Sequence, residues 1–272
     1  MERPLTELAG GQIIICGVAS LDNWLYVLRG KPAEQVEVYD TNTSNLRGRL
    51  IVPGLGDRGD IVACPRNRCA YISDYSNDSI HRVCVSFAAP SVTNWPVNDK
   101  PACLSVTDKH NVLATCCKGR KIKEFSTDGK LLRQFKLPAD TLAPWHTILL
   151  SSGQYIVSHC FANPSGNSSH RVCLLDSDRH VVQSFGGPQG SGSQQLNMPR
   201  HVAVGRKGYV FVADQNNCRV VLLSPSLHFV REVVSGDQLE GRAERLCLDK
   251  SKRVLYVAVN KKQRGRVVVV RV

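Results

Sequence analysis

The sequence predicts an all-β fold: a six-bladed β-propeller with four-stranded antiparallel blades, closed by the N-terminal segment as the outer strand of the last blade. Three observations predict it. The chain of 272 residues repeats one pattern six times. Most copies hold four short extended pieces separated by polar turns. The last copy ends at its third extended piece, which leaves the N-terminus as the unassigned segment.

The repeat is measured from the residue that leads the second strand of each copy. These residues recur every 42 to 55 positions and are Tyr26, Tyr71, Leu113, Ile156, Phe211 and Tyr256. A period of this length is typical of propeller blades. We expect one domain over residues 1–272, with repeats at roughly 12–56, 57–100, 101–141, 142–196, 197–240 and 241–272.

Each remaining element follows from the same pattern. Third strands are predicted after each polar corner, at 35–40, 80–85, 121–126, 170–175, 218–223 and 266–272. Fourth strands are clearest at 130–137 and 228–234. The Gly/Ser/Asn-rich insertions 162–169 and 186–195 are predicted to be loops. Residues 3–10 are predicted to complete the sixth blade, so that no sheet edge stays open.

Composition excludes several classes. No segment approaches the ~18 apolar residues of a membrane span, and charged residues interrupt the N-terminal stretch where a signal peptide would be apolar. We expect a soluble cytoplasmic protein, monomeric as an isolated domain. The eleven cysteines form no Cys-x-x-Cys pair, and four lie in apolar strand runs as small hydrophobes: Cys84, Cys173, Cys218 and Cys247. We therefore expect no metal and no cofactor.

The formal charge of +12 arises from 35 Lys and Arg against 23 Asp and Glu. Basic residues recur at the corner between the second and third strands, and corners of one type share one face of a propeller. That face would attract a polyanion. The corner set is Arg29, Lys31, His81, Arg82, Lys118, Arg120, Lys121, His170, Arg171, Arg219, Lys261, Lys262, Arg264 and Arg266. The alternative is structural, since Asp214 and Arg219 can pair and hold their turn.

Residues 197–223, NMPRHVAVGRKGYVFVADQNNCRVVLL, resemble an NHL repeat. The matching positions, in order, are Pro199, Gly208, Val212, Ala213, Asp214, Asn217 and Arg219. The second and sixth copies keep part of this motif, and the others keep only the strand pattern. The resemblance implies a non-enzymatic recognition domain like that of TRIM-NHL proteins, which bind RNA or protein partners on a charged face.

By this resemblance the ligand face holds the loops entering each first strand and the corners after each second strand. The RNA- or partner-binding residues it nominates are Tyr75, Arg120, Lys121, Trp145, His146, Arg200, His201, Gln215, Asn216, Arg245, Lys261 and Lys262. Trp145, His146 and Tyr75 are candidates for stacking on bases, with Lys and Arg on phosphates. The alternative for Trp145 is packing between blades, and Trp24 and Trp95 are expected in the core.

Three functions remain possible for the chain. The chain is expected to bind RNA, with a protein-interaction scaffold, such as the substrate-recognition domain of a ubiquitin-ligase-type protein, as the alternative. The less favoured reading is an enzyme, because six-bladed propellers include metal-dependent lactonases and amidating lyases. Their inward-facing ligands would correspond here to the ends of the second strands: Arg29, Asp74, Cys116, His159, Asp214 and Val259. No catalytic residue is assigned, and we expect no enzyme.

Overall fold

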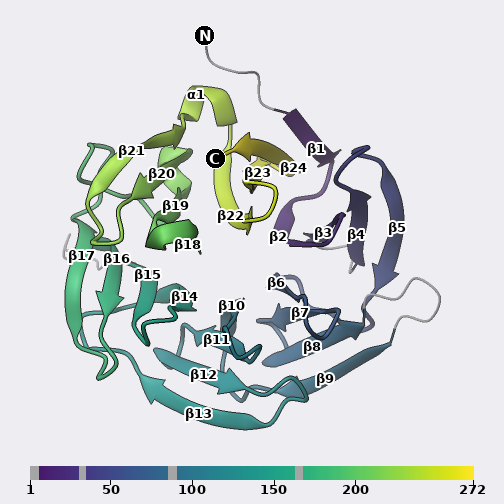
Figure 1. The fold of residues 1–272 in the computed structure, drawn as a ribbon, viewed down its shortest axis with the longest axis horizontal. Helices are drawn as coiled ribbons and strands as arrows, with labels where there is room; N and C mark the ends of the chain where they lie inside the picture. Colours follow the sequence, from purple (N-terminus) through teal and green to yellow (C-terminus); the bar gives the residue numbers. More distant parts are fainter. Residues whose placement is uncertain (1–5, 31–34, 85–90, 163–167) are drawn as a thin grey trace.

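The structure, a computed structural model, describes residues 6–30, 35–84, 91–162 and 168–272. It confirms the six-bladed propeller. Six four-stranded antiparallel sheets surround a central axis (Figure 1). Residues 3–5 of the predicted closing segment, Lys31 and most of the predicted loop 162–169 lie outside the described residues. Among the described residues, no helix is long and apolar enough to cross a membrane.

The strands of blades 1 to 5 follow one another from the innermost to the outermost position of each sheet. Blade 1 contains β2 (Ile15–Leu21), β3 (Trp24–Arg29), β4 (Gln35–Asp40) and β5 (Leu46–Ile51). Blade 2 contains β6 (Gly59–Cys64), β7 (Cys69–Asp74), β8 (Ser79–Cys84) and β9 (Val92–Pro96). Blade 3 contains β10 (Pro101–Val106), β11 (Val112–Cys116), β12 (Lys121–Phe125) and β13 (Leu131–Lys136).

The second half of the ring repeats this order. Blade 4 contains β14 (Pro144–Leu149), β15 (Tyr155–Ala162), β16 (Ser168–Leu175) and β17 (Val181–Gly187). Blade 5 contains β18 (Pro199–Val204), β19 (Val210–Asp214), β20 (Arg219–Leu223) and β21 (Phe229–Val234). Blade 6 contains β22 (Arg242–Asp249), β23 (Val254–Lys261) and β24 (Arg264–Arg271), with β1 (Thr6–Gly11) outside them.

Burial explains why the second strands read as continuous apolar runs. Every residue of β7, β11 and β19 is buried, because a neighbouring blade packs against each face of these sheets. The outermost strands β5 and β13 are mostly exposed. Apolar clusters therefore fill the spaces between blades, as between blades 2 and 3, where the ring of Trp95 packs against that of Phe125 with centroids 6.3 Å apart. The core expectation for Trp95 is confirmed, since only 8% of it is exposed.

The N-terminal strand closes the ring as predicted. β1 pairs antiparallel with β24, with Thr6 opposite Val269 and Leu8 opposite Val267. Leu8 is buried among side chains of blades 6 and 1. The first and last parts of the chain thus share one sheet, and the outer edge of blade 6 is covered.

Arg29 fastens this closure. It lies at the end of β3 in blade 1 and is 4% exposed. Its guanidinium donates to the carbonyl oxygens of Ala9 in β1 (2.6 Å), Gly265 in β24 (3.2 Å) and Ile13 (3.0 Å). Its Nε donates to Glu37 Oε2 at 2.7 Å, so the buried charge has a counter-ion. One side chain therefore ties blade 1 to both outer strands of blade 6.

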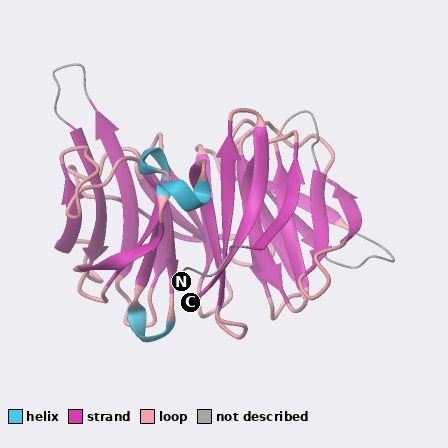
Figure 2. Cartoon of the chain, turned by 90° about the horizontal axis from the view of Figure 1, so that it is seen from above, coloured by secondary structure: helices cyan, strands magenta, loops and turns pink. Residues whose placement is uncertain are grey.

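The two faces of the ring carry different connections between strands. The antiparallel order places the starts of the first strands and the corners between second and third strands on one face, which we call the upper face. The turns between first and second strands lie on the opposite, lower face. Figure 2 agrees: α1 (Gly236–Leu239) and η2 (Gln215–Asn217) lie on one side of the disc, and η1 (Arg206–Gly208) lies on the other.

Replacing Arg29 tests the closure. We expect Arg29→Met to lower the free energy of unfolding by about 3 kcal/mol, because it removes three bonds to carbonyls and leaves Glu37 buried without its closest counter-ion. Arg47→Met is the matched control: Arg47 pairs with Asp40 at 3.1 Å, but its side chain is 48% exposed. Urea unfolding should show a loss of under about 1 kcal/mol for that control. Equal losses of unfolding free energy in both variants would contradict the role of Arg29 in ring closure.

Candidate functional site in the central channel

The first strand of each blade lines the central channel, and five of the six carry a β-bulge near their start. The register shifts lie after Ile15, Pro101, Pro144, Pro199 and Ala243. Three of these residues are prolines, which cannot donate a ladder hydrogen bond. A bulge re-aims the side chains beside it. The bulged residues are Cys16, Ala102, Trp145, Arg200 and Glu244.

Four polar side chains meet inside the channel: Asp60, His146, His201 and Arg245. They come from β6, β14, β18 and β22, and none is more than 6% exposed. The Arg245 Nε donates to Asp60 Oδ1 at 3.2 Å, and His201 Nε2 lies 3.5 Å from Asp60 Oδ2. The rings of His146 and His201 stack with centroids 3.7 Å apart. We call this group the central polar cluster; its four residues all lie on the innermost strands of their blades.

The cluster joins successive blades by accepting backbone N–H bonds. Asp60 Oδ2 accepts from Leu104 in blade 3 at 3.0 Å. His146 Nδ1 accepts from Val202 in blade 5 at 3.3 Å, and His201 Nδ1 accepts from Leu246 in blade 6 at 3.4 Å. Since these Nδ1 atoms are acceptors, each neutral imidazole carries its proton on Nε2. The His146 Nε2 uses that proton to donate to the carbonyl oxygen of Leu104 at 3.0 Å.

Burial sets the charges in the cluster. It lowers the pKa of His146 well below its ordinary value, and the neighbouring His201 lowers it further. It also lowers the pKa of His201, although Asp60 opposes this. Burial disfavours the Asp60 carboxylate, but the hydrogen bond from His201 and the charge of Arg245 outweigh it, so the pKa of Asp60 is lowered. The cluster therefore holds one carboxylate, one guanidinium and two neutral imidazoles.

Asp60, His146 and His201 also have the spacing of a metal site, with one ligand atom each, all within 4.8 Å of one another. Their bonds do not fit that role. The imidazole nitrogens already face backbone groups or the carboxylate, and Arg245 already balances Asp60. A divalent cation would add two uncompensated buried charges beside a guanidinium. The geometry fits a structural cross-link between blades better than it fits a metal centre.

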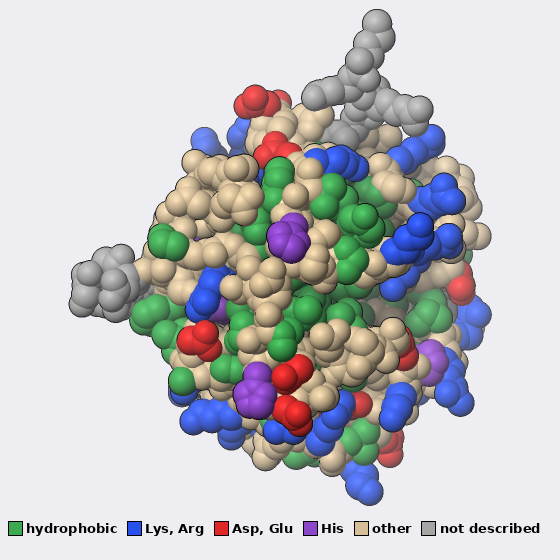
Figure 3. Space-filling view, turned by 60° about the vertical axis from the view of Figure 1, so that its left-hand side comes forward, with side chains coloured by type: hydrophobic (Ala, Val, Ile, Leu, Met, Phe, Trp, Pro, Cys, Tyr) green, Lys and Arg blue, Asp and Glu red, His purple; other side chains and the backbone are tan. Residues whose placement is uncertain are grey.

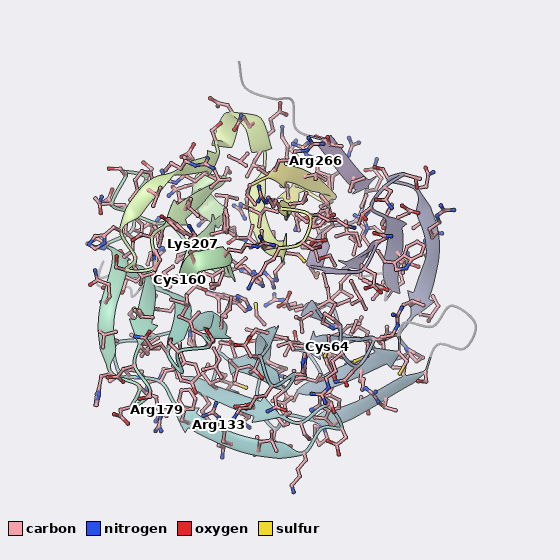
Figure 4. All side chains as sticks on the ribbon, in the orientation of Figure 1. Cys64, Arg133, Cys160, Arg179, Lys207 and Arg266 are labelled. Atoms are coloured by element: carbon pink, nitrogen blue, oxygen red, sulfur yellow. The ribbon has the colours of Figure 1, made fainter. Side chains whose placement is uncertain are left out.

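A second group lies at the upper end of the channel, formed by three of the bulged residues, Trp145, Arg200 and Glu244, together with Gln215 of η2. The Arg200 guanidinium lies 4.0 Å over the Trp145 ring, and its Nε is 3.4 Å from Glu244 Oε2. Gln215 Nε2 donates to Glu244 Oε1 at 2.6 Å. The Trp145 indole donates to the Sγ of Cys160, which Figure 4 labels on the inner part of blade 4. We call Trp145, Arg200, Gln215 and Glu244 the upper mouth.

The structure divides the residues nominated from sequence into three groups. Trp145, Arg200 and Gln215 meet in the upper mouth. His146, His201 and Arg245, nominated for the ligand face, are instead 2%, 6% and 5% exposed and already hydrogen-bonded, so the His146 ring is not offered to a base. The third group lies on the upper face of separate blades: Tyr75, Arg120, Lys121, Asn216, Lys261 and Lys262.

Members of the third group have their own partners. Tyr75 lies under the Lys100 ammonium, 5.6 Å from its ring centroid. Arg120 donates to the carbonyl oxygen of Ala139 at 3.0 Å, and Asn216 donates to Asn197 Oδ1 at 3.2 Å. Lys261 pairs with Glu240 at 3.4 Å. Lys121 begins β12, and Lys262 is exposed at the corner between β23 and β24.

The positions proposed from sequence for a catalytic metal do not line the channel. Asp74, His159 and Asp214 lie on second strands, inside their blades. Asp214 accepts from Arg219 Nε at 2.8 Å, which confirms the predicted pairing across the corner. The role of the channel residues was missed because first strands, not second strands, face the axis. His146, His201 and Arg245 were nominated for a ligand face, and Asp60 and Glu244 were not nominated. A signal was present in Pro144-Trp-His146 and Pro199-Arg-His201, which repeat at equivalent places.

Comparisons with known proteins agree on the fold alone. No family model matches the chain, and no curated protein matches it. Among solved structures, the chain is similar to hydrazine synthase of Kuenenia stuttgartiensis, at 12% identity and a TM-score of 0.69, covering 95% of each chain. It is similar to virginiamycin B lyase from Staphylococcus aureus, at 11% identity and a TM-score of 0.68, covering 98% of this chain and 99% of that one.

A third similar structure is the β-propeller domain of Cps50 (Swd1) from Myceliophteria thermophila. It is 13% identical with a TM-score of 0.60, and 95% of this chain and 84% of that chain are covered. At such identities the likeness establishes the propeller architecture. The resemblance to NHL repeats stays a prediction from residues 197–223.

The buried ion pair of the cluster can be tested with a double-mutant cycle. Asp60→Asn keeps an acceptor for Leu104 but leaves Arg245 without a counter-ion, and Arg245→Met does the converse. We expect each single change to lower the free energy of unfolding by about 3 kcal/mol or more, and the double variant to lose clearly less than the sum. Urea unfolding measures this, with the exposed Asp108→Asn as control. Strictly additive losses would mean that the pair is not coupled.

The buried histidines predict an acid sensitivity. Burial lowers the pKa of His146, His170 and His201, and that of His159 to about 4. The unfolded chain takes up these protons below its ordinary pKa of about 6.5, whereas the folded chain does not. Stability should therefore fall as pH falls through about 6.5, by up to about 1.4 kcal/mol per pH unit for each histidine.

The measurement is urea unfolding across pH 7 to 5. His146→Gln should remove one histidine's share of the slope, about 1.4 kcal/mol per pH unit. The exposed His180→Gln is the matched control and should leave the slope intact. A slope unchanged by His146→Gln would contradict the neutral assignment of that imidazole.

Proposed function

We propose that this chain is a non-enzymatic recognition module that binds a protein partner through its upper face, with the upper mouth as the anchor. The observation that carries the proposal is the pairing of the corner cations. An RNA reader needs cations free to hold phosphates over one continuous field, whereas a protein-binding face combines patchy charge with aromatic anchors.

Five corner cations are neutralised by carboxylates of this chain. The pairs are Arg29–Glu37, Arg171–Asp140, Arg219–Asp214, Lys261–Glu240 and Arg266–Glu7. Each pair cancels one positive charge of the set that suggested a polyanion. Figure 3 shows blades 4 and 5 turned forward, with Lys and Arg around the edge of the view and Asp and Glu among them. These pairs therefore favour patchy charge over a single field.

The upper mouth has the composition of an interface anchor. Trp, Tyr and Arg are the residues most enriched among those that dominate binding energy at protein interfaces. Arg200 is stacked on Trp145 and held by Glu244, and its side chain is 22% exposed. Glu244 is held in turn by Gln215. Because these side chains are already ordered, a partner loses little conformational entropy in binding them.

RNA binding stays the second candidate because of blade 3. Within the described chain, no carboxylate lies within ion-pair distance of Lys118, Arg120 or Lys121, which follow one another around the corner after β11. This corner offers a local phosphate-binding patch. It is smaller than the face that the sequence suggested, so it supports RNA binding less strongly than the upper mouth supports a protein partner.

Two parallel selections distinguish the candidates. A displayed random-peptide library is selected on the wild-type chain, and a randomised RNA pool is selected at about 50 and about 200 mM salt. We expect a peptide motif to be enriched, and its affinity to fall at least about tenfold in Trp145→Ala/Arg200→Ala, the cost expected for an interface anchor. Lys118→Glu/Lys121→Glu should leave that affinity unchanged. Circular dichroism checks that both variants fold.

The opposite pattern overturns the proposal. If an RNA motif is enriched at the higher salt and is lost in Lys118→Glu/Lys121→Glu, the chain is an RNA reader. Peptide enrichment that survives Trp145→Ala/Arg200→Ala would place the partner site away from the upper mouth.

A further inference from the structure

Below the central polar cluster, the channel opens on the lower face as a cavity of about 1060 Å³. Residues from the first strands of all six blades line it. We propose that this lower cavity binds a small amphipathic organic anion: an apolar ring system that carries one carboxylate, sulfonate or phosphate group. The site is separate from the upper mouth, and the inference does not rest on the proposed function.

The walls of the cavity suit an apolar body. Half-buried apolar side chains line it, among them Ala63, Val106, Ile148, Val204 and Leu248. Small-molecule pockets are lined mainly by apolar side chains and have volumes of roughly 300–1,000 Å³. The lower cavity, at about 1060 Å³, lies just above that range, so it accommodates a ring-bearing ligand rather than a single ion.

The inner end of the cavity is flat and uncharged. The stacked rings of His146 and His201 close it, with an angle of 14° between their planes. Their nitrogens already bond to Val202, Leu246, Leu104 and Asp60. Because the two rings are only 2% and 6% exposed, the inner end offers a ligand no charge and little ring surface, so the walls and the rim provide the complementarity.

The outer rim carries unpaired positive charge. Arg206 and Lys207 lie on η1, between β18 and β19, and Lys250 lies on the turn after β22 of the next blade. All three are exposed, and in the described part of the chain no carboxylate lies within ion-pair distance of them. Figure 4 labels Lys207 on blade 5. The acidic rim residue Asp108 belongs to blade 3, so the cations concentrate at blades 5 and 6.

The rim therefore differs from most of the upper face, where five corner cations have carboxylate partners. The cavity combines apolar walls, an uncharged inner end and free cations at its rim. These features are complementary to a small amphipathic organic anion. Its apolar part is buried along the walls, and its anionic group stays at the rim, near Arg206, Lys207 and Lys250. Because the negative group keeps its contact with water, little desolvation opposes binding.

Two fluorescent probes of nearly the same shape test the proposal. Anilinonaphthalene sulfonate has an apolar ring system and one sulfonate, and N-phenylnaphthylamine is its uncharged analogue. We expect the sulfonate to bind the folded chain at one site and to bind more tightly than the uncharged analogue. Lys207→Glu/Lys250→Glu should weaken the sulfonate about tenfold, the order expected for reversing two partly screened charges. The uncharged analogue should be unaffected.

Two further variants locate the site. Lys118→Glu/Lys262→Glu makes the same charge change on the upper face and should leave binding intact. Ala63→Trp places a large ring in the lower cavity and should abolish binding of both probes; circular dichroism shows whether it folds. If Ala63→Trp does not fold, the contrast between the two charge-reversal variants decides the location.

Three results would overturn the proposal. The first is no saturable binding of the sulfonate probe. The second is equal affinity for the two probes, which would mean an apolar cavity without preference for anions. The third is equal weakening by the upper-face and lower-face charge reversals, which would mean general electrostatic attraction to a basic chain.

Discussion

Every blade of this ring must have a neighbour on both faces, and the rest of the structure depends on that constraint. Second strands such as β7 and β19 are buried along their whole length, so an open ring would expose two apolar sheet faces to water. Sequence distance makes closure costly, because blades 1 and 6 lie at opposite ends of the chain. Two interactions stabilise the closed ring at the junction of blades 1 and 6. β1 pairs with β24 in blade 6, and Arg29 donates to the carbonyl oxygens of Ala9 and Gly265.

The same geometry brings polar side chains to the axis. Six first strands converge there, and side chains on them meet groups from other blades instead of solvent. Asp60, His146 and His201 satisfy their hydrogen-bonding capacity there by accepting hydrogen bonds from backbone N–H groups of other blades. Residues that resemble a catalytic or metal-binding group are thereby used to join blades. The channel is divided into an upper mouth, rich in Trp and Arg, and a lower cavity with apolar walls.

The architecture was predictable because it depends on local pattern. A strand leader every 42 to 55 residues, turn residues between strands and a missing last strand identify the blades and their closure. The site was only partly predictable, because it depends on contacts between distant residues. Asp60 and Arg245 are 185 positions apart in the sequence. Whether two such distant side chains meet depends on how their blades are placed around the ring. The pairing of Asp214 with Arg219 was foreseen because both belong to one corner.

The bulges explain how one short segment contributes to both ends of the channel. In Trp145-His146, Arg200-His201 and Glu244-Arg245, the bulged residue belongs to the upper mouth and the next residue to the central polar cluster. A regular strand would send these neighbours to opposite faces of the sheet, whereas the bulge re-aims one of them. The cluster's bonds to Leu104, Val202 and Leu246 involve none of the side chains of the mouth. The mouth can therefore change its side chains, and with them its partner, while the ring keeps its central cross-links.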